Sequence, residues 1–317
     1  MYGLAIGDAL GMPTQLLSRA QIQARYGAML TRFEPASPDH LIAAGRPAGA
    51  VTDDTEQAVL LGRLLTRGPV EPREFAGALV AWERTMAGRG SLDLLGPSTK
   101  RAIAAVLAGQ DPEQAGRYGD TNGAAMRITP VGIATRAPGL VDAVVAASRV
   151  THNTGIALAG AAAVAAVVSA GIDGATFADA LPIALAAARE AAGRGYWVAG
   201  ADVAARIEWA TTLVAGLAAT EAAERIYTLV GTSLATQESV PAAFAVLAAV
   251  PADPWRACLL AASLGGDCDT IAAMAGAMGG ATTGMAALPA EAIAVIDAQG
   301  LDLAQLADEL YRLRNHN

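Results

Sequence analysis

Two acidic clusters of the same chemical form lie far apart in this chain. The first is Thr52-Asp53-Asp54-Thr55, and the second is Asp267-Cys268-Asp269-Thr270. Each offers two carboxylates beside a threonine hydroxyl, and all-oxygen donors of this kind suit hard cations such as Mg²⁺ or Mn²⁺. Together they supply about six oxygens, the number that an octahedral ion requires, or hold two ions if carboxylates bridge. The pattern therefore predicts a metal-assisted hydrolase.

Helix capping is the alternative interpretation of both clusters. Asp53-x-x-Glu56 before an apolar run fits a capping box, and Asp267 and Thr270 precede a second apolar run. Capping requires one carboxylate, whereas each cluster has two. A helix N-terminus also favours the charged form of a carboxylate, so one cluster can cap a helix and face a cation. Considered jointly, the clusters predict one shared metal site.

The composition limits the partners and the location of the protein. A chain of 317 residues with 53% hydrophobic residues can bury a large core. The formal charge of −8 argues against bulk attraction to nucleic acid or to anionic lipid. The segment Met1–Met12 lacks the features of a secretory signal, and two cysteines, Cys258 and Cys268, fit a reducing compartment without a disulfide. We expect a cytoplasmic protein that binds neither nucleic acid nor a membrane.

The elements that position these residues are expected to be helices. Alanine dominates, aromatic residues make up only 4%, and strand-like alternation is rare. No linker and no heptad repeat appear, so the pattern predicts one all-α domain over residues 1–317, built as a compact multi-helix bundle. Expected helices run over Glu56–Leu65, Arg73–Ala87, Ser98–Ala108, Leu140–Ser148, Gly155–Ala170, Ala175–Ala192, Asp202–Ala218, Glu221–Val230, Val240–Leu247, Pro254–Leu264, Thr270–Met278 and Leu301–Arg314.

Two segments carry expectations of their own. The segment Gly155–Ile172 is uncharged and close to membrane-spanning length, but alanine and glycine dominate it, which favours a helix buried among other helices. The loop Phe33–Gly49 contains three prolines and two glycines and leads directly into the first acidic cluster. We expect this loop to act as a mobile lid or to face the substrate.

Other candidate site residues lie between the acidic clusters. In Asn122-Gly123-Ala124-Ala125-Met126-Arg127, small residues would let backbone N–H groups approach phosphate or ribose oxygens, although a plain turn into a helix is the alternative. His152 is one of three histidines and is a candidate substrate contact or a structural residue. Gln237 and Glu238 precede Val240-Pro241, where we expect a helix start with a capping role for the pair.

In their order along the chain these motifs resemble the ADP-ribosylglycohydrolases, which include dinitrogenase-reductase-activating and ADP-ribosyl-arginine hydrolases. The resemblance covers most of the chain and implies an all-α orthogonal bundle with two Mg²⁺ per chain in a cleft, with Mn²⁺ as a possible substitute. It implies that Asp269 bridges the two ions and that Asn122, Gly123, Ala124, Met126, Arg127 and His152 contact the substrate. By the same resemblance the metal ligands are Thr52, Asp53, Asp54, Asp267, Asp269 and Thr270. The motifs are Gly7-Asp8-Ala9-Leu10-Gly11, Thr52-Asp53-Asp54-Thr55, Asp120-Thr121-Asn122-Gly123-Ala124-Ala125-Met126-Arg127, Thr151-His152, Glu238-Ser239-Val240-Pro241 and Leu264-Gly265-Gly266-Asp267-Cys268-Asp269-Thr270.

One position departs from the family pattern. The well-studied members carry a glutamate shortly after Gly-Asp-Ala-Leu-Gly, and this chain has Gln15 there. An amide cannot transfer a proton, so that role is lost or moved elsewhere. Asp93 resembles the acidic segment that supplies a general base in bacterial members, although a loop aspartate ahead of a capping serine is the alternative. The variant Met12-Pro13-Thr14 resembles a bacterial subgroup whose substrates need not be ADP-ribosylated proteins, so Gln15 is expected to contact a smaller riboside.

The expected reaction is hydrolysis of an N- or O-ribosyl bond in an ADP-ribosylated protein or a small riboside. Mg²⁺ would hold the ribose hydroxyls, a metal-held or Asp93-activated water would attack C1″, and Asp54 and Asp269 would stabilise the positive charge that develops there. Three alternatives stay open: a nucleoside-type N-glycosidase, a ribosyl-binding or signalling module that has lost catalysis, and a metal-dependent prenyl cyclase. The last has few aromatic rings for a carbocation pocket.

Overall fold

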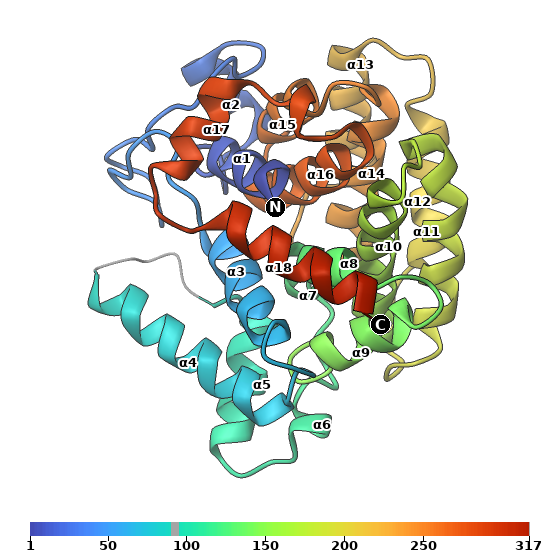
Figure 1. Cartoon of the computed structure of the whole chain (residues 1–317). Coiled ribbons are helices and arrows are strands. Elements are labelled where there is room, and N and C mark those ends of the chain that lie inside the picture. The colour runs from blue at the N-terminus through green and yellow to red at the C-terminus, as the bar shows by residue number, and fades with distance from the viewer. Residues whose placement is uncertain (90–94, 317) are drawn as a thin grey trace.

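The computed structural model describes residues 1–89 and 95–316, and helices account for its architecture (Figure 1). In these ranges the extended backbone is limited to two isolated bridges, Thr121 with Ala235 and Thr154 with Tyr196. The all-α prediction is therefore confirmed. The helices are α1 Tyr2–Gly11, α2 Arg19–Tyr26, α3 Asp53–Leu65, α4 Pro72–Gly88, α5 Pro97–Leu107, α6 Pro112–Ala115, α7 Gly123–Met126, α8 Thr129–Ala134, α9 Leu140–Ser148, α10 Gly155–Ile172, α11 Phe177–Ala192, α12 Val203–Leu213, α13 Ala219–Arg225, η1 Ile226–Val230, α14 Thr236–Ala249, α15 Pro254–Ala262, α16 Cys268–Thr283, η2 Met285–Ala287, α17 Ala290–Asp297 and α18 Leu303–His316.

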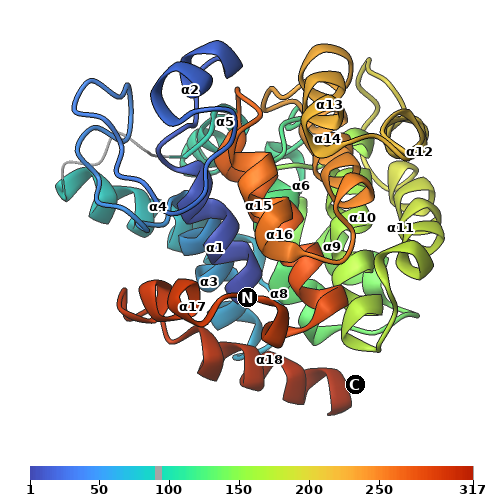
Figure 2. The same cartoon turned by 90° about the horizontal axis from the view of Figure 1, so that it is seen from above.

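Helix α10 lies at the centre of the bundle. It packs against α11, α16, α14 and α8, and Figures 1 and 2 show it enclosed between these helices. Its length and composition would allow it to cross a membrane, but 78% of its apolar window is buried within the protein. The hydroxyl of Thr154 begins the helix by accepting the N–H of Ala157 at 3.2 Å. The prediction of a helix buried among other helices is confirmed.

Helix α14 begins four residues before the predicted start at Val240, so that prediction is wrong. Pro241 lies inside the helix and has no N–H to donate to the carbonyl of Gln237, one turn earlier. The side chain of Arg206 compensates, because its Nε donates to that carbonyl oxygen at 3.2 Å. The sequence pattern places Pro241 at a helix start. The structure places it inside α14, where Arg206 from the neighbouring α12 bonds the carbonyl that the proline leaves without a donor.

Helix α1 is not among the helices predicted from the sequence, although it positions the candidate site. All of its residues except Tyr2 are buried, so it shows no amphipathic pattern, and its three glycines lower its intrinsic helix propensity. Tertiary packing stabilises it instead. The helices α2, α6, α7, α8 and α17 were also missed, and apart from α2 and α17, which have eight residues each, they span six residues or fewer.

Helices α1 and α16 approach each other closely along their length and run in opposite directions. A Cβ atom at Gly3 would lie 2.0 Å from the carbonyl oxygen of Gly276, and one at Gly7 would lie 2.0 Å from that of Ala272. At Gly11 it would lie 2.3 Å from the Cα of Asp269. Because only glycine fits at these contacts, the spacing Gly3-x3-Gly7-x3-Gly11 sets the distance between α1 and the start of α16.

Candidate active site

The structure brings the two acidic clusters together. Asp53 and Asp54 form the first turn of α3, and Asp267 immediately precedes α16. The hydroxyl of Thr270 donates to Oδ2 of Asp54 at 3.3 Å, although 216 positions separate them in sequence. Two helix N-termini therefore present carboxylates and hydroxyls to one place, where their partial positive charge favours anionic side chains.

The first cluster does not form the capping box that was the alternative interpretation. The carboxylate of Asp8, from α1, accepts the N–H groups of Thr52 at 2.9 Å and Thr55 at 3.1 Å, and also the Thr55 hydroxyl. Glu56 instead accepts the indole N–H of Trp82 at 2.6 Å. The hydroxyl of Thr52 caps α3 by accepting the N–H of Asp54 at 3.4 Å, so the threonine part of the capping alternative is confirmed. Because Thr52 and Asp8 satisfy N–H groups of the first turn, neither carboxylate of the cluster is needed for capping.

The second cluster also has a carboxylate that does not cap its helix. Asp267 occupies the N-cap position of α16 but makes no side-chain capping bond there. Its Oδ2 instead accepts from Nδ2 of Asn122 at 2.5 Å, and the same Nδ2 donates to the Ser239 hydroxyl at 3.0 Å. The capping interpretation therefore explains the carboxylates of neither cluster.

A cavity of about 130 Å³ lies over the clusters and collects most of the predicted site residues. Ile42 brings the loop Phe33–Gly49 into its wall, and the substrate-facing role of this loop stays a prediction. Leu16, Gly96, Pro97, Thr99, Thr121 and Leu234 complete it. The predicted residues that line it are Gln15, Asp53, Asn122, Gly123, Met126, Asp267, Asp269 and Thr270.

Burial raises the pKa values of three of the carboxylates, those of Asp8, Asp54 and Asp267. Burial raises the pKa of Asp54 well above its ordinary value, and the charges of Asp269, Asp53 and other aspartates add to the rise. Burial likewise raises the pKa of Asp8 to about 6, although its hydrogen bonds from Thr55 and Thr52 oppose the rise. A group of buried like charges is stabilised by a cation that neutralises their repulsion.

The donor set fits a hard cation. Oδ1 of Asp54 is buried and has no hydrogen-bond partner, which is unusual for a buried carboxylate oxygen. Within residues 1–89 and 95–316 no three His, Cys, Asp or Glu side chains form a ready-made metal group. The site therefore depends on carboxylates completed by the hydroxyls of Thr52 and Thr270, and oxygen donors of this type suit Mg²⁺ or Mn²⁺.

Three predicted substrate contacts lie behind the cavity wall. Ala124 and Arg127 are each 1% exposed, His152 is fully buried, and none of the three lines the cavity. Burial lowers the pKa of Arg127 to about 10. Burial, then the charges of Arg127 and Arg101, hold the pKa of His152 well below its ordinary value, so its imidazole is neutral. The middle motif reaches the cavity through Asn122, Gly123 and Met126.

The remaining predicted residues have separate positions. Asp93 lies outside the described residues. Gln15 is 4% exposed in the cavity wall, and its Nε2 is buried without a hydrogen-bond partner. Glu238 accepts the N–H of Ser233 at 3.1 Å and makes no capping bond to α14, so the predicted capping role is wrong. Sequence reasoning assigned no role to Asp8, although this residue stands in the first motif that carried the resemblance.

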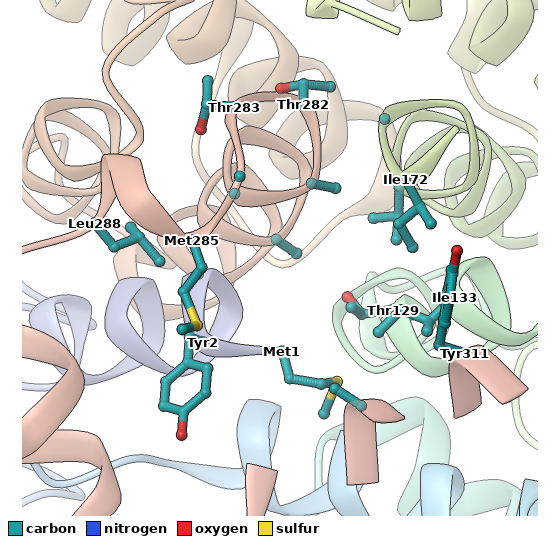
Figure 3. A pocket seen from close by; sticks show the side chains of 18 of the residues that line it. Met1, Tyr2, Thr129, Ile133, Ile172, Thr282, Thr283, Met285, Leu288 and Tyr311 are labelled. Carbon is teal, nitrogen blue, oxygen red and sulfur yellow. The ribbon is translucent and has the colours of Figure 1, made fainter. Parts of the chain in front are cut away.

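A larger cavity of about 570 Å³ lies at the other ends of α1 and α16 (Figure 3). Met1, Tyr2, Met285 and Tyr311 line it, and among the described residues Asp308 is the one carboxylate residue in this lining. Among the residues that the structure describes, its lining brings together no cluster of carboxylates comparable to that at the smaller cavity. Chemistry rather than volume therefore identifies the candidate active site.

Comparison with known proteins identifies the family of this chain. The family model described as ADP-ribosylglycohydrolase matches residues 1–317. The uncharacterized protein YegU of Escherichia coli K12 is 36% identical over 324 aligned positions, which cover 99% of this chain and 96% of that protein. The ADP-ribosyl-[dinitrogen reductase] glycohydrolase of Rhodospirillum rubrum is 30% identical over 162 residues, 48% of this chain and 49% of that one. A solved structure described as an ADP-ribosylglycohydrolase-related protein complex has a TM-score of 0.67 at 26% identity and covers 98% of this chain and 95% of its own. This chain belongs to the ADP-ribosylglycohydrolase family.

Proposed function

We propose that this protein is a Mg²⁺-dependent hydrolase that cleaves an N- or O-ribosyl bond. The observation that supports it most is the convergence of the two acidic clusters: Asp53, Asp267 and Asp269 line one small cavity, and the buried Asp54 lies behind its wall, joined to Thr270 by a hydrogen bond. Membership of the family supports hydrolysis of an ADP-ribose linkage in general. The metal dependence and the smaller substrate are the finer parts of the proposal.

Six residues of the two acidic clusters, four aspartates and two threonines, would hold two Mg²⁺. Asn122 would restrain Asp267 through its amide, and Asp8 would hold the first turn of α3 in place. When bound, the ions would supply Lewis-acid polarisation and a more acidic water. Asp54 and Asp269 would stabilise positive charge at the sugar carbon as the bond to the leaving group breaks. Asp93 remains the proposed general base. The six proposed ligands are Thr52, Asp53, Asp54, Asp267, Asp269 and Thr270.

Two observations support a small riboside rather than an ADP-ribosylated protein as the substrate. Among the described residues the cavity of about 130 Å³ is well below the roughly 300 Å³ at which pockets for drug-sized ligands begin. Gln15 replaces a carboxylate with a neutral amide in its wall. An uncharged amide attracts a cationic guanidinium leaving group less than a carboxylate does.

A mass-spectrometric panel tests the proposal. The substrates are small ribosides, nucleosides, ADP-ribosyl-arginine and ADP-ribosyl-serine, each incubated with Mg²⁺ and with a chelator. We expect release of the aglycone from a small riboside with Mg²⁺ and none with the chelator. Cleavage that persists in the chelator would refute the metal dependence. Riboside binding without turnover would instead support a ribosyl-binding module, and cleavage of nucleosides alone would support an N-glycosidase.

A further inference from the structure

A chain of hydrogen bonds passes beneath the cavity and joins two of its walls. The residues at its two ends, Asp53 and Thr121, both line the cavity, and every residue between them is at most 1% exposed. Buried polar side chains that satisfy one another are rigid, because leaving any one of them unpaired costs free energy. We call this chain the buried network. Its members, in order, are Asp53, Gln57, Arg127, Thr151, His152 and Thr121.

Arg127 determines the direction of the first arm of the buried network. Its Nη1 donates to Oε1 of Gln57 at 2.7 Å. A guanidinium has donors only, so the oxygen of the Gln57 amide must face Arg127. The amide nitrogen then faces the site and donates to Oδ2 of Asp53 at 2.7 Å. The amide orientation, which is otherwise ambiguous in a protein structure, follows here from the chemistry of its neighbour.

Arg127 determines the direction of the second arm in the same way. Its Nη2 donates to the hydroxyl oxygen of Thr151, which leaves the Thr151 proton for Nδ1 of His152 at 2.8 Å. The Ser148 carbonyl is a poorer acceptor for that proton at 3.4 Å. A neutral imidazole that accepts at Nδ1 carries its proton on Nε2, which donates to Oγ1 of Thr121 at 3.0 Å.

The second arm ends on a hydroxyl that still has a proton to donate. Because Oγ1 of Thr121 accepts from His152, its own proton points away from the imidazole, and Thr121 lines the cavity. Gly123 makes room for this arrangement, since a Cβ there would lie 2.8 Å from Cε1 of His152. The imidazole is thus packed directly under the cavity wall.

We propose that Arg127 polarises the buried network so that it holds the Asp53 carboxylate in one orientation and presents the Thr121 hydroxyl as a donor to the substrate. Gln57, Arg127 and His152 are positioning residues, and Thr121 is a substrate contact. The group that Thr121 would recognise is an oxygen acceptor, either a sugar hydroxyl or a phosphate oxygen. The identity of the substrate in this inference rests on the proposed function. The directions of the hydrogen bonds are independent of it.

Two variants of Gln57 test the arm that reaches Asp53. Gln57→Glu keeps an oxygen for Arg127 and removes the donor to Asp53, and Gln57→Met removes both. We expect both to weaken Mg²⁺ binding in calorimetry by about 10–100-fold, the usual cost of losing a group that orients a ligand. The added negative charge of Gln57→Glu would by itself strengthen Mg²⁺ binding. Weaker Mg²⁺ binding in both variants would therefore show that the lost amide donor to Asp53 is the cause. The matched charge control is Gln110→Glu, an exposed position.

The same arm has a test that does not need a metal. In chelator, Asp53→Ala should shift the side-chain amide signal of Gln57 in ¹⁵N spectra and speed its hydrogen exchange. Mg²⁺ affinity within twofold of wild type in either Gln57 variant, or a Gln57 amide unchanged by Asp53→Ala, would overturn this arm. Should the wild type bind no Mg²⁺, the metal dependence fails, and the amide signal still decides about the network.

The arm that reaches Thr121 is tested by the tautomer of His152. Long-range ¹H–¹⁵N spectra in chelator should show the proton on Nε2 at neutral pH, and a proton on Nδ1 would overturn the arm. In kinetics, Thr121→Val should raise KM for the cleaved riboside about tenfold, the cost of one neutral hydrogen bond, and Thr121→Ser should restore it. An unchanged KM in Thr121→Val would refute the substrate contact. A wild type without turnover would refute the proposed function and leave the tautomer test intact.

Discussion

At the scale of single residues, Asp8 and Asp54 are both fully buried carboxylates with different roles. Asp8 accepts backbone N–H groups and a hydroxyl, so its charge is satisfied by the first turn of α3. Asp54 keeps one buried oxygen without a hydrogen-bond partner and accepts weak bonds at the other, at 3.2 Å from Thr52 and 3.3 Å from Thr270. Their hydrogen-bond partners thus distinguish Asp8, which holds the first turn of α3, from Asp54, which is a proposed metal ligand.

Loss of one ligand charge should abolish metal binding. We expect Asp269→Asn to remove bound Mg²⁺ in calorimetry and to lower riboside turnover by several orders of magnitude, because this carboxylate is the proposed bridge between the ions. The matched control is Asp302→Asn, since Asp302 has φ of 56° just before α18 and asparagine accepts that conformation. Two Mg²⁺ retained per chain in Asp269→Asn would contradict the assignment.

The substitution at Gln15 should be partly reversible. We expect Gln15→Glu to raise activity on ADP-ribosyl-arginine or ADP-ribosyl-serine above the low wild-type level in the mass-spectrometric assay. The gain should be well below the 10²–10⁴-fold typical of an evolved general acid or base, because a grafted group is rarely well oriented. Gln23→Glu, at an exposed position of α2, is the charge control. Efficient cleavage of ADP-ribosyl substrates by the wild type would refute the small-riboside preference.

The buried His152 should make stability depend on pH. Its folded-state pKa lies well below 6.5, so below that pH the unfolded chain binds a proton that the folded protein excludes, and stability falls as the pH decreases. Between pH 7.5 and 5.5 the cost is about 1.4 kcal/mol. We therefore expect the free energy of unfolding, measured with urea in chelator, to fall between these two pH values by about that much more in the wild type than in His152→Gln. Equal losses would contradict a buried neutral imidazole.

At the scale of elements, α1 links the two clusters. One face carries Gly3, Gly7 and Gly11 against α16, while Asp8 reaches the N-terminus of α3. The separation between Asp54 and Asp269 is therefore set by a helix that contributes neither of them. An accurate ligand geometry depends on such supporting contacts.

A methyl group at the α1–α16 contact should disturb the metal site. We expect Gly11→Ala to displace Asp269, because the added carbon would lie 2.5 Å from its backbone nitrogen as well as 2.3 Å from its Cα. Mg²⁺ affinity in calorimetry should fall at least tenfold, and the melting temperature should fall. In Gly77→Ala, inside α4, the new methyl group meets no atom within 4 Å, so that protein should be more stable by up to about 1 kcal/mol. Unchanged affinity in Gly11→Ala would contradict the spacing role.

At the scale of the whole molecule, a helical bundle encloses several like charges next to its core. The carboxylates lie where α1, α3 and α16 meet, and burial raises the pKa values of Asp8, Asp54 and Asp267. Holding these groups together without a counter-ion opposes folding, since burial and repulsion both disfavour the charged forms. A cation that binds only the folded protein should stabilise it.

The melting temperature should therefore depend on Mg²⁺. A ligand that binds only the native state adds RT ln(1 + [L]/Kd), about 2.7 kcal/mol at a hundredfold excess over Kd, which corresponds to several degrees for a protein of this size. Differential scanning fluorimetry with millimolar Mg²⁺ and with a chelator measures this shift. Na⁺ at matched ionic strength controls for screening. Superimposable melting curves would show that the clusters do not bind the ion.

The fold class could be predicted from the sequence, and so could the oxygen-rich side chains of the proposed site. Helical periodicity is a local property, so twelve helices were placed from it, and Leu140–Ser148 agrees with α9 at both ends. The oxygen donors were also evident, because Asp-Asp-Thr and Asp-x-Asp-Thr are visible as short motifs. Their order along the chain was enough to indicate the family that the comparisons confirm.

Which of these residues meet, and which groups each one contacts, could be seen only in the folded protein. The carboxylates of the first cluster are not needed for capping because Asp8 reaches α3 from a helix that packing rather than propensity stabilises. Arg127 and His152 were expected at the substrate, yet both lie behind the cavity wall, because nothing in a motif specifies whether a side chain points inward. Those roles depend on contacts between residues far apart in sequence, which exist only once the chain has folded.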